Sequence, residues 1–572
     1  MGVLDYLRAS SIVHSIQRHD LVNTPEIQKP VWLPVSGTIP SWLNGILYRI
    51  GPAKYNLGDQ NGKQYMIRHA FDGLPFIHRF EISSEQQKVR YNSRLTAEAV
   101  EQSLVNGNSS GIFFGHMPDE EQGWGRFAKT IQRLDNTLFR ATPQDVTLAN
   151  PSSRAVGVTV TPNYPLPKAF QRDANDRVLV AKSDYNMLQK VDEDTLEPQL
   201  LFEYNHYDDK NLHGIPTAAH HQYDPETGET FNFLINFGRA PSMTVFALDR
   251  TGTQSRVLAN ITHRKLANGD MSEPILLSYI HSFWLTKHYV IIPESPLHYG
   301  NRGLDVVMSG TIVTGLAWNK NTPAYLHVVS RDTGGLLVSL PTDPFFTFHT
   351  ANAWDTTDDK TGQPVIHLDC CAFDSADFLY KLYNLGQQGM TENRNNNKKM
   401  EPIEYRGITI DENNMPTSHA DLRRYSLTWG DKENKATSTT ITSNVEFPRF
   451  SQAHMLKPYQ FLWGCQASQD DASQSILCKV DLDTGHVTRN TTSSSKGYSF
   501  SEPIFAPRPN ATREDDGVLL SFVNNIPDHR CLLAIMDAST LEEIATCDIG
   551  EFTATTFHGS FVSDQFENIS VN

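Results

Sequence analysis

The chain has 572 residues, and its content of 39% hydrophobic, 10% aromatic and 20% charged residues is typical of a globular protein with a large core. A formal net charge of −16, without clustered Lys and Arg beyond short loop runs, argues against a nucleic-acid partner. The six cysteines match neither a disulfide framework nor a zinc finger, and no apolar run reaches the roughly 18 residues of a membrane span.

The expected elements along the chain are mostly short strands. Residues 3–19, within an N-terminal segment of residues 1–30, are loosely amphipathic and predict a helix. From about residue 45 onward, apolar and β-branched segments alternate with polar turns. Examples in chain order are GILYRIGP, FIHRFEI, RVLVAKSD, ETFNFLINFG, YVIIPE, AYLHVVSRDTGG, DGVLLSFV and LLAIMDAST. Many short strands without long helices between them predict one all-β domain over residues 1–572, a propeller or a large barrel.

Helical content is expected to be small. The segment DSADFLYKLYNLGQQGM predicts a short helix within an insertion at about residues 372–400. Polar low-complexity stretches such as TENRNNNKKM follow it and are typical of surface loops.

Four of the 21 histidines stand out because they lie in strand-like apolar segments with a carboxylate or a small residue nearby. They are His220 in PTAAHHQYDPETGE, His281 in YIHSFWLTKHY, His349 in FFTFHTANAWD and His558 in TATTFHGSFV. One such histidine alone is more often a hydrogen-bonded core residue than a ligand. The successive separations are 61, 68 and 209 residues, the last being about three times 70, which suits a blade length of roughly 60 to 80 residues. We therefore predict that the inner strands of four propeller blades bring these rings together on the axis.

Convergent neutral imidazoles can bind Fe, Zn, Cu or Ni, and affinity alone does not select among these metals. Hydrolytic zinc sites typically use three protein ligands and one water, so a set of four histidines is unlike them. In an octahedral ion, four protein ligands leave two adjacent positions open, which suits O2 activation. The ligand set therefore favours Fe(2+), one per chain.

Metal-binding histidines usually donate their other ring N–H to a carboxylate or a carbonyl. Three acids in apolar segments are candidates for this role: Asp184 in VAKSDYNML, Glu446 in NVEFPRF and Glu502 in FSEPIFAP. The alternative for each is an acid at a strand end that faces solvent. His221 and His288 stand at odd offsets from His220 and His281, so in continuous strands they are predicted to point away from the metal.

These segments together resemble the carotenoid cleavage oxygenase family, from about residue 30 to residue 565. TAAHHQYDPETGE, HSFWLTKHYVIIPE, FHTANAWD and FHGSFV are similar to the four metal-ligand segments of the family, in the same order. LYRIGPAKYNLGD and RHAFDGLPFIHRFEI near the start are similar to family segments as well.

The resemblance implies a seven-bladed β-propeller with a dome of loops and helices over a substrate tunnel. It also implies catalytic iron(II) on the axis, with the ligands His220, His281, His349 and His558. Asp184, Glu446 and Glu502 would hold those rings. The family cleaves a conjugated C=C bond with O2 to give two carbonyl products, and it needs no reductant or organic cofactor.

The sequence departs from the family at three places. Asp184 is one methylene shorter than the usual glutamate, which predicts a water-mediated or absent bond to a ligand histidine. His221 stands where a proline often follows the first histidine. The segment RFAKTIQRLDNTLF lacks the Pro-Asp-Pro-Cys stretch of the animal branch, which weakens an assignment to its retinal-forming members, although IHLDCCAFDSADFLYKLYNL resembles that branch.

Three candidate functions stay open at this point. A carotenoid or apocarotenoid is favoured over a phenolic stilbene as substrate, because relatives that cleave stilbenes have lysine directly before the acid. Here Lys182 stands two positions before Asp184. A non-catalytic propeller that binds protein partners is the remoter alternative, although no feature indicates a particular protein partner.

The predicted tunnel and the predicted membrane contact rest on apolar side chains. Trp284, Phe345 and Trp354 are candidates to line the tunnel, with ordinary core packing as the alternative. The cluster Phe378, Leu379, Tyr380, Leu382 and Tyr383 predicts either a peripheral membrane contact through which a polyene enters, or packing of a dome helix. Without a signal-peptide core, we expect a cytoplasmic protein, whether or not it touches a membrane.

Overall fold

A computed structural model gives the fold. It describes residues 13, 16–18, 21–58, 62–108, 111–118, 145–171, 177–237, 240–385, 403–410, 420–430, 434–468, 474–490 and 496–563. Val13 and Ile16 are helical and buried, while most of the helix predicted over residues 3–19 lies outside these residues. Residues 386–400 of the predicted dome insertion and the segment RFAKTIQRLDNTLF lie outside them too.

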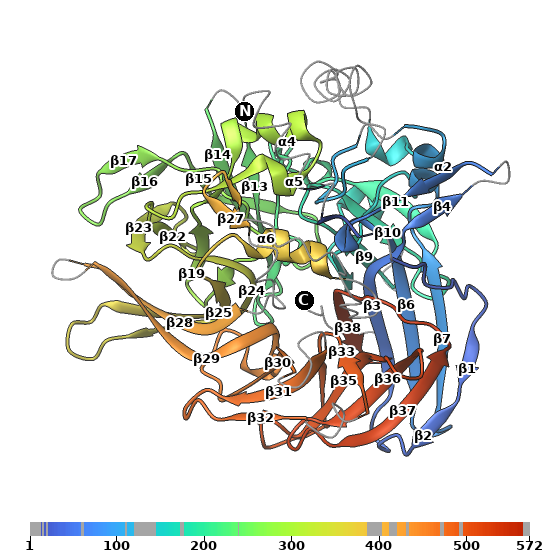
Figure 1. Cartoon of the computed structure of the whole chain (residues 1–572). Coiled ribbons are helices and arrows are strands. Elements are labelled where there is room, and N and C mark those ends of the chain that lie inside the picture. The colour runs from blue at the N-terminus through green and yellow to red at the C-terminus, as the bar shows by residue number, and fades with distance from the viewer. Residues whose placement is uncertain are drawn as a thin grey trace.

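The described strands form a seven-bladed β-propeller, as the family resemblance implied (Figure 1). The alternation of strands and turns had predicted a propeller or a large barrel. Neighbouring strands in each blade are antiparallel, and most of them follow one another along the chain, which is typical of a meander. The long strand β29 (Lys435–Arg449) belongs to two blades, because it pairs with β28 along its first part and with β30 from Glu446 to Arg449.

The first four blades are built as follows. Blade one contains β38 (His558–Val562), β3 (Gly45–Lys54), β6 (Leu74–Ser83), β7 (Lys88–Leu95) and β1 (Val31–Leu33). Blade two contains β8 (Thr159–Pro162), β9 (Leu179–Lys182), β10 (Leu188–Val191) and β11 (Pro198–Phe202). Blade three contains β12 (Gln222–Tyr223), β13 (Thr230–Asn236), β14 (Ser242–Leu248) and β15 (Ser255–Ile261). Blade four contains β18 (Trp284–Leu285), β19 (Tyr289–Glu294), β22 (Ala324–Ser330) and β23 (Leu336–Thr342).

The last three blades complete the ring. Blade five contains β24 (Phe346–Thr357), β25 (Pro364–Phe373), β28 (Ala420–Thr428) and β29. Blade six contains β29, β30 (Phe461–Ala467), β31 (Ser475–Asp481) and β32 (Val487–Arg489). Blade seven contains β33 (Tyr498–Phe500), β34 (Ile504–Pro507), β35 (Gly517–Asn525), β36 (Arg530–Asp537), β37 (Glu543–Gly550) and β2 (Val35–Gly37).

Two pairings between distant parts of the chain close the ring. Strand β38, near the C-terminus, pairs with β3 in blade one, and β2 pairs with β37 in blade seven. Each pairing satisfies backbone groups that an open ring would leave exposed at a sheet edge. The first of them also fixes His558, the first residue of β38, opposite Ile50.

Short helices and hairpins lie outside the blades, and α6 lies near the centre of the ring in the view of Figure 1. The helices are α2 (Glu98–Val105), α4 (Leu304–Ser309), α5 (Ile312–Gly315) and α6 (Phe378–Lys381). The 3-10 turns are η1 (Ala70–Asp72), η3 (Val146–Leu148), η4 (Lys168–Phe170), η5 (Tyr204–His206), η6 (Gly300–Gly303), η7 (Leu382–Asn384) and η9 (Gln452–His454). The hairpins are β4–β5 (Asn56–Gly58, Gln64–Met66), β16–β17 (His263–Lys265, Met271–Pro274), β20–β21 (Leu297–Tyr299, Leu316–Trp318) and β26–β27 (Ile403–Tyr405, Ile408–Ile410).

The apolar cluster at residues 378–383 packs inside the protein. Its five apolar side chains are at most 5% exposed and belong to the largest core cluster, so the membrane interpretation of these residues is wrong and the packing interpretation holds. Among the described residues, no helix is both long enough and apolar enough to cross a membrane. All six cysteines are buried and free of disulfide bonds.

Candidate metal centre and cavity

The four predicted histidines come together near the propeller axis. One ring nitrogen from each of His220, His281, His349 and His558 lies within 4.8 Å of the others. Nε2 of His220 is 3.1 Å from Nε2 of His281, and Nε2 of His349 is 3.3 Å from Nε2 of His558. Among the described residues, this is the group of His, Cys, Asp and Glu side chains whose geometry suits a metal ion.

Only two of the four histidines lie within strands, which corrects the prediction that all four do. His349 is in β24 and His558 begins β38, whereas His220 and His281 lie in loops just before the two-residue inner strands β12 and β18. The register of β24 against β25 shifts on both sides of Thr350. Such bulges redirect side chains, which explains how this long strand can aim His349 at the axis.

Three carboxylates contact the Nδ1 atoms of three of these four rings. Asp184 Oδ2 lies 2.6 Å from Nδ1 of His281, Glu446 Oε2 lies 2.5 Å from Nδ1 of His349, and Glu502 Oε1 lies 2.8 Å from Nδ1 of His558. Asp184 lies between β9 and β10, Glu446 in β29 where it joins β30, and Glu502 between β33 and β34. Each of the seven blades therefore contributes one histidine or one carboxylate to the centre.

The contact of Asp184 is direct. The 2.6 Å separation from His281 contradicts the expectation of a water-mediated or absent bond. The shorter side chain reaches because the backbone around it is tied to the loop of His220: Thr217 N donates to Asp184 O, and Ala219 N donates to Asp184 Oδ1 at 3.1 Å.

Glu502 is the most strongly held of the three acids. It accepts hydrogen bonds from Arg49, from Arg449 and from the backbone N–H of Gly559. Burial alone would raise the pKa of Glu502, but Arg449, His558 and Arg49 lower it far below the ordinary value. Burial lowers the pKa of His558 to about 3 although Glu502 acts to raise it, so the ring is neutral at pH 7.

The donor set suits a divalent cation. Nδ1 of His349 faces Glu446 and Nδ1 of His558 faces Glu502, so in the tautomer that donates Nδ1–H to these carboxylates both Nε2 atoms carry lone pairs. Two lone pairs that face each other at 3.3 Å make no hydrogen bond. A cation between them removes that repulsion, and its four nitrogen donors are those that iron, zinc, copper or nickel accept.

The neighbouring histidines lie outside this cluster. His221 Nδ1 contacts Lys182 Nζ, and His288 is exposed with Nδ1 2.6 Å from Asp355 Oδ2. The offset argument for His288 does not hold, because residues 286–288 form a turn instead of continuing the strand. The prediction that His288 lies away from the metal nevertheless agrees with the structure.

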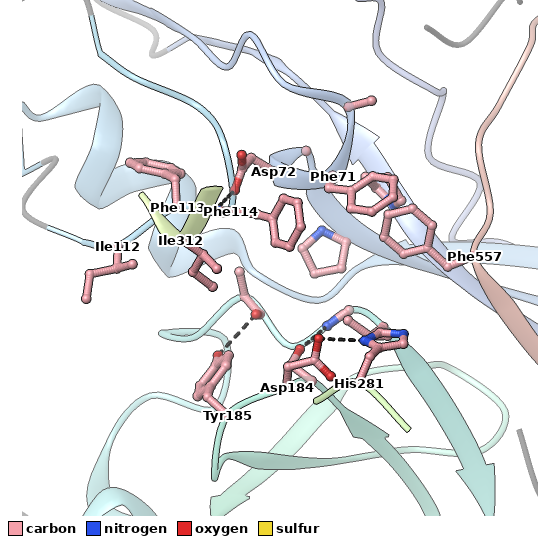
Figure 2. A pocket seen from close by; sticks show the side chains of 18 of the residues that line it. Phe71, Asp72, Ile112, Phe113, Phe114, Asp184, Tyr185, His281, Ile312 and Phe557 are labelled. Atoms are coloured by element: carbon pink, nitrogen blue, oxygen red, sulfur yellow. Dashed lines mark hydrogen bonds and ion pairs between the residues drawn. The ribbon is translucent and has the colours of Figure 1, made fainter. Parts of the chain in front are cut away.

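A cavity of about 1800 Å³ reaches the centre. Asp184, His281, His349, Glu446 and His558 line part of it. Figure 2 shows aromatic side chains, Phe71, Phe114 and Phe557, across the cavity from Asp184 and His281. Much of the remaining wall is apolar and comes from loops and from the short helices α2, α4 and α5.

The predicted tunnel residues do not line this cavity, so that prediction is wrong for it. Trp284 and Phe345 pack in one core cluster and Trp354 in another. Trp284 Nε1 donates to the carbonyl of Asp369 at 2.8 Å, which ties β18 to β25 in the neighbouring blade. These side chains stabilise the contact between blades.

Sequence reasoning missed the residues that shape the wall. Asp72 accepts backbone hydrogen bonds from Phe114, Gly115 and His116 at 2.6 to 2.8 Å, and so fixes the loop that carries Phe114. Phe71 packs edge-on against Phe557, beside His558. Asp72 and Phe71 stand in RHAFDGLPF, whose family resemblance indicated no role for either residue. The signal available in the sequence was Asp72 directly before Gly73, a pair that is typical of turns.

Comparisons with known proteins agree with this geometry. The family model for RPE65, retinal pigment epithelial membrane protein, matches residues 22–563. Torulene dioxygenase of Gibberella fujikuroi is 28% identical over 556 residues, covering 93% of this chain and 91% of that protein. Beta,beta-carotene 15,15′-dioxygenase of Mus musculus is 26% identical over 584 residues, covering 95% and 91%. A cobalt-substituted apocarotenoid oxygenase of Synechocystis has the same fold, with a TM-score of 0.66, 21% identity and 98% of each chain covered.

Proposed function

Because the chain belongs to the RPE65/carotenoid cleavage oxygenase family and is an oxygenase, we propose that it is a non-haem iron(II) dioxygenase. It cleaves a conjugated C=C bond of a carotenoid or apocarotenoid with O2 and releases two carbonyl products. The observation that carries this proposal is the cluster of four histidines, three of which line a largely apolar cavity.

His220, His281, His349 and His558 hold the iron, and Asp184, Glu446 and Glu502 keep three of these rings oriented with Nδ1 protonated. When bound, Fe(II) supplies the centre at which O2 is activated. Cleavage of an alkene by O2 to two carbonyls balances without an external reductant. The chain's own task is therefore to place one double bond beside the centre and to exclude water.

The cavity wall performs that positioning. Phe71, Phe114 and Phe557 offer flat apolar surfaces to a polyene, and Phe348 and Phe447 lie beside the histidines. Phenylalanine side chains provide no hydrogen bond, so shape and cavity length select the double bond that is cleaved.

The position of Lys182 speaks against a phenolic stilbene as substrate. Its Nζ contacts His221 and the carbonyl of Ala219, and it lies over the ring of Tyr164. Lys182 does not line the cavity, although Ser183, Asp184 and Tyr185 do. A phenol oxygen in the cavity would therefore not meet this lysine.

The cavity rim suits a lipid surface. Ile112, Ile215, Leu304 and Leu385 line the cavity and are between 36% and 57% exposed. Exposed apolar residues around a cavity for a lipid-soluble substrate support a peripheral membrane contact at the rim. We expect the double variant I215D/L304D to float less with phospholipid vesicles. V257D, at an exposed residue of β15 outside the cavity lining, should float like the wild type. Cell fractionation checks the predicted cytoplasmic location.

Anaerobic purification followed by metal analysis and product chromatography tests the proposed function. We expect one iron per chain and carbonyl products from one or more of β-carotene, torulene and an apocarotenal, with none from resveratrol. A protein that retains no iron, or that cleaves resveratrol alone, contradicts the proposal. Limited proteolysis checks whether residues 1–572 behave as a single domain.

A further inference from the structure

The support of Asp184 differs from that of the other two carboxylates. Glu502 is held by two arginines, and Glu446 Oε2 accepts the backbone N–H of Phe447. Asp184 Oδ2 instead accepts two hydrogen bonds from one segment, from His281 Nδ1 at 2.6 Å and from the phenol of Tyr279 at 2.7 Å. The hydroxyl of Tyr279 is thus the side-chain donor that holds Asp184 against His281.

The ring of Tyr279 is itself held in place. It is 2% exposed, lines the cavity, and stacks on Phe346 of β24 with 5.9 Å between centroids and 12° between planes. Its hydroxyl therefore meets Asp184 from a fixed position. Asp184 in turn contacts the segments of two histidines, because Oδ1 accepts the N–H of Ala219, which precedes His220.

We propose that Tyr279 is a positioning residue of the metal centre, which acts through Asp184 to hold the ring of His281. Without the phenol, Asp184 can rotate toward the cavity, and the hydrogen bond that keeps His281 oriented and protonated at Nδ1 weakens. Loss of such an outer contact lowers metal affinity by roughly 10- to 100-fold. This inference rests on the metal site of the proposed function.

The experiment measures metal retention, which is independent of turnover. Purified wild type, Y279F, D184N and the double variant Y279F/D184N are loaded anaerobically with Co(II), and its release to a chelator is followed by the visible spectrum. We expect Y279F to release Co(II) roughly 10- to 100-fold faster than the wild type. The double variant should release it no faster than D184N, because both substitutions act on one contact.

Y185F is the matched control. Tyr185 also lines the cavity and follows Asp184 directly, but its hydroxyl donates to the carbonyl of Ala155 at 3.1 Å. It should retain Co(II) like the wild type, and comparison of thermal midpoints separates a folding defect from a metal defect. Retention by Y279F equal to that of Y185F overturns the role of Tyr279 while leaving the metal site intact. Multiplicative effects in the double variant overturn the path through Asp184. A wild type that takes up no Co(II) or iron overturns the proposed function and this inference together.

Discussion

The histidine cluster and the cavity wall differ in the kind of contact that holds their side chains in place. In the cluster, His281, His349 and His558 each contact a carboxylate, and the seven contributing groups come from seven blades. In the wall, Phe71, Phe114 and their neighbours come from loops and short helices and meet through apolar contacts. The difference teaches that inner strands and the short connections beside them hold the centre, whereas, in the proposed function, the loops and short helices that cover the blades meet the substrate. The two regions should therefore respond to mutation in different ways.

The largest effect is expected within the cluster. H281A removes one nitrogen donor and leaves the Asp184 carboxylate without its imidazole partner. We expect the variant to lose stoichiometric iron and more than about 100-fold in turnover, a loss larger than that of an outer contact. H288A, whose ring lies outside the cluster, should keep both. Equal losses from the two variants, in metal analysis and in product formation, would contradict the assignment of the centre.

The next effect is on stability. E502Q leaves the buried guanidinium of Arg49 and that of Arg449 without their carboxylate. Breaking a buried ion pair on one side costs about 3–5 kcal/mol, which urea unfolding measures. The exposed pair of Arg530 and Glu551 provides the control, because E551Q should unfold like the wild type. If E502Q were as stable as E551Q, the centre would not depend on its carboxylates.

The wall should show the reverse pattern. F114A enlarges the cavity without touching the histidines, so we expect a changed ratio of cleavage products and a raised KM at unchanged iron content. W284F provides the contrast, since Trp284 packs between blades and lies outside the cavity lining. It should lose about 1–3 kcal/mol of stability through the unpaired carbonyl of Asp369 and leave the product ratio unchanged. A product shift in W284F alone would restore the original tunnel prediction.

The smallest effect concerns the loop behind Phe114. Burial alone would raise the pKa of Asp72, but His69 and the N–H groups of Gly115 and His116 lower it below the ordinary value of 3.8. Because the pKa of Asp72 is lower in the folded protein than in the unfolded chain, its ionised carboxylate stabilises the fold above pH 3.8. This stabilisation is lost as the pH falls through the pKa of the folded state. D72N should therefore be less stable than the wild type at pH 7, and the gap should narrow below about pH 3.8. If the difference in unfolding free energy between D72N and the wild type stayed constant across this pH range, Asp72 would not be the group that fixes this loop.

The role of a residue could be predicted from the sequence where its side chain is unusual for the segment around it. His281 and Glu446 stand out because imidazole and carboxylate groups are costly in apolar segments unless they are partnered. Trp284 and Phe114 do not stand out, because an aromatic residue in an apolar segment suits a core and a cavity equally well. The wrong tunnel residues and the missed wall residues have this one cause.

By itself the sequence determined the all-β class, the family and the set of polar residues that needed partners, since these follow from local pattern and from the cost of burying polar groups. Tertiary structure alone decided that Asp184 reaches His281 directly, that residues 378–383 are buried, and that Trp284 faces a neighbouring blade instead of the cavity. Each of these depends on how one blade or loop packs against another that is distant in the chain. The physical reason is that contacts between residues far apart in the chain set the direction and the neighbours of a side chain. Local propensity carries no information about such contacts.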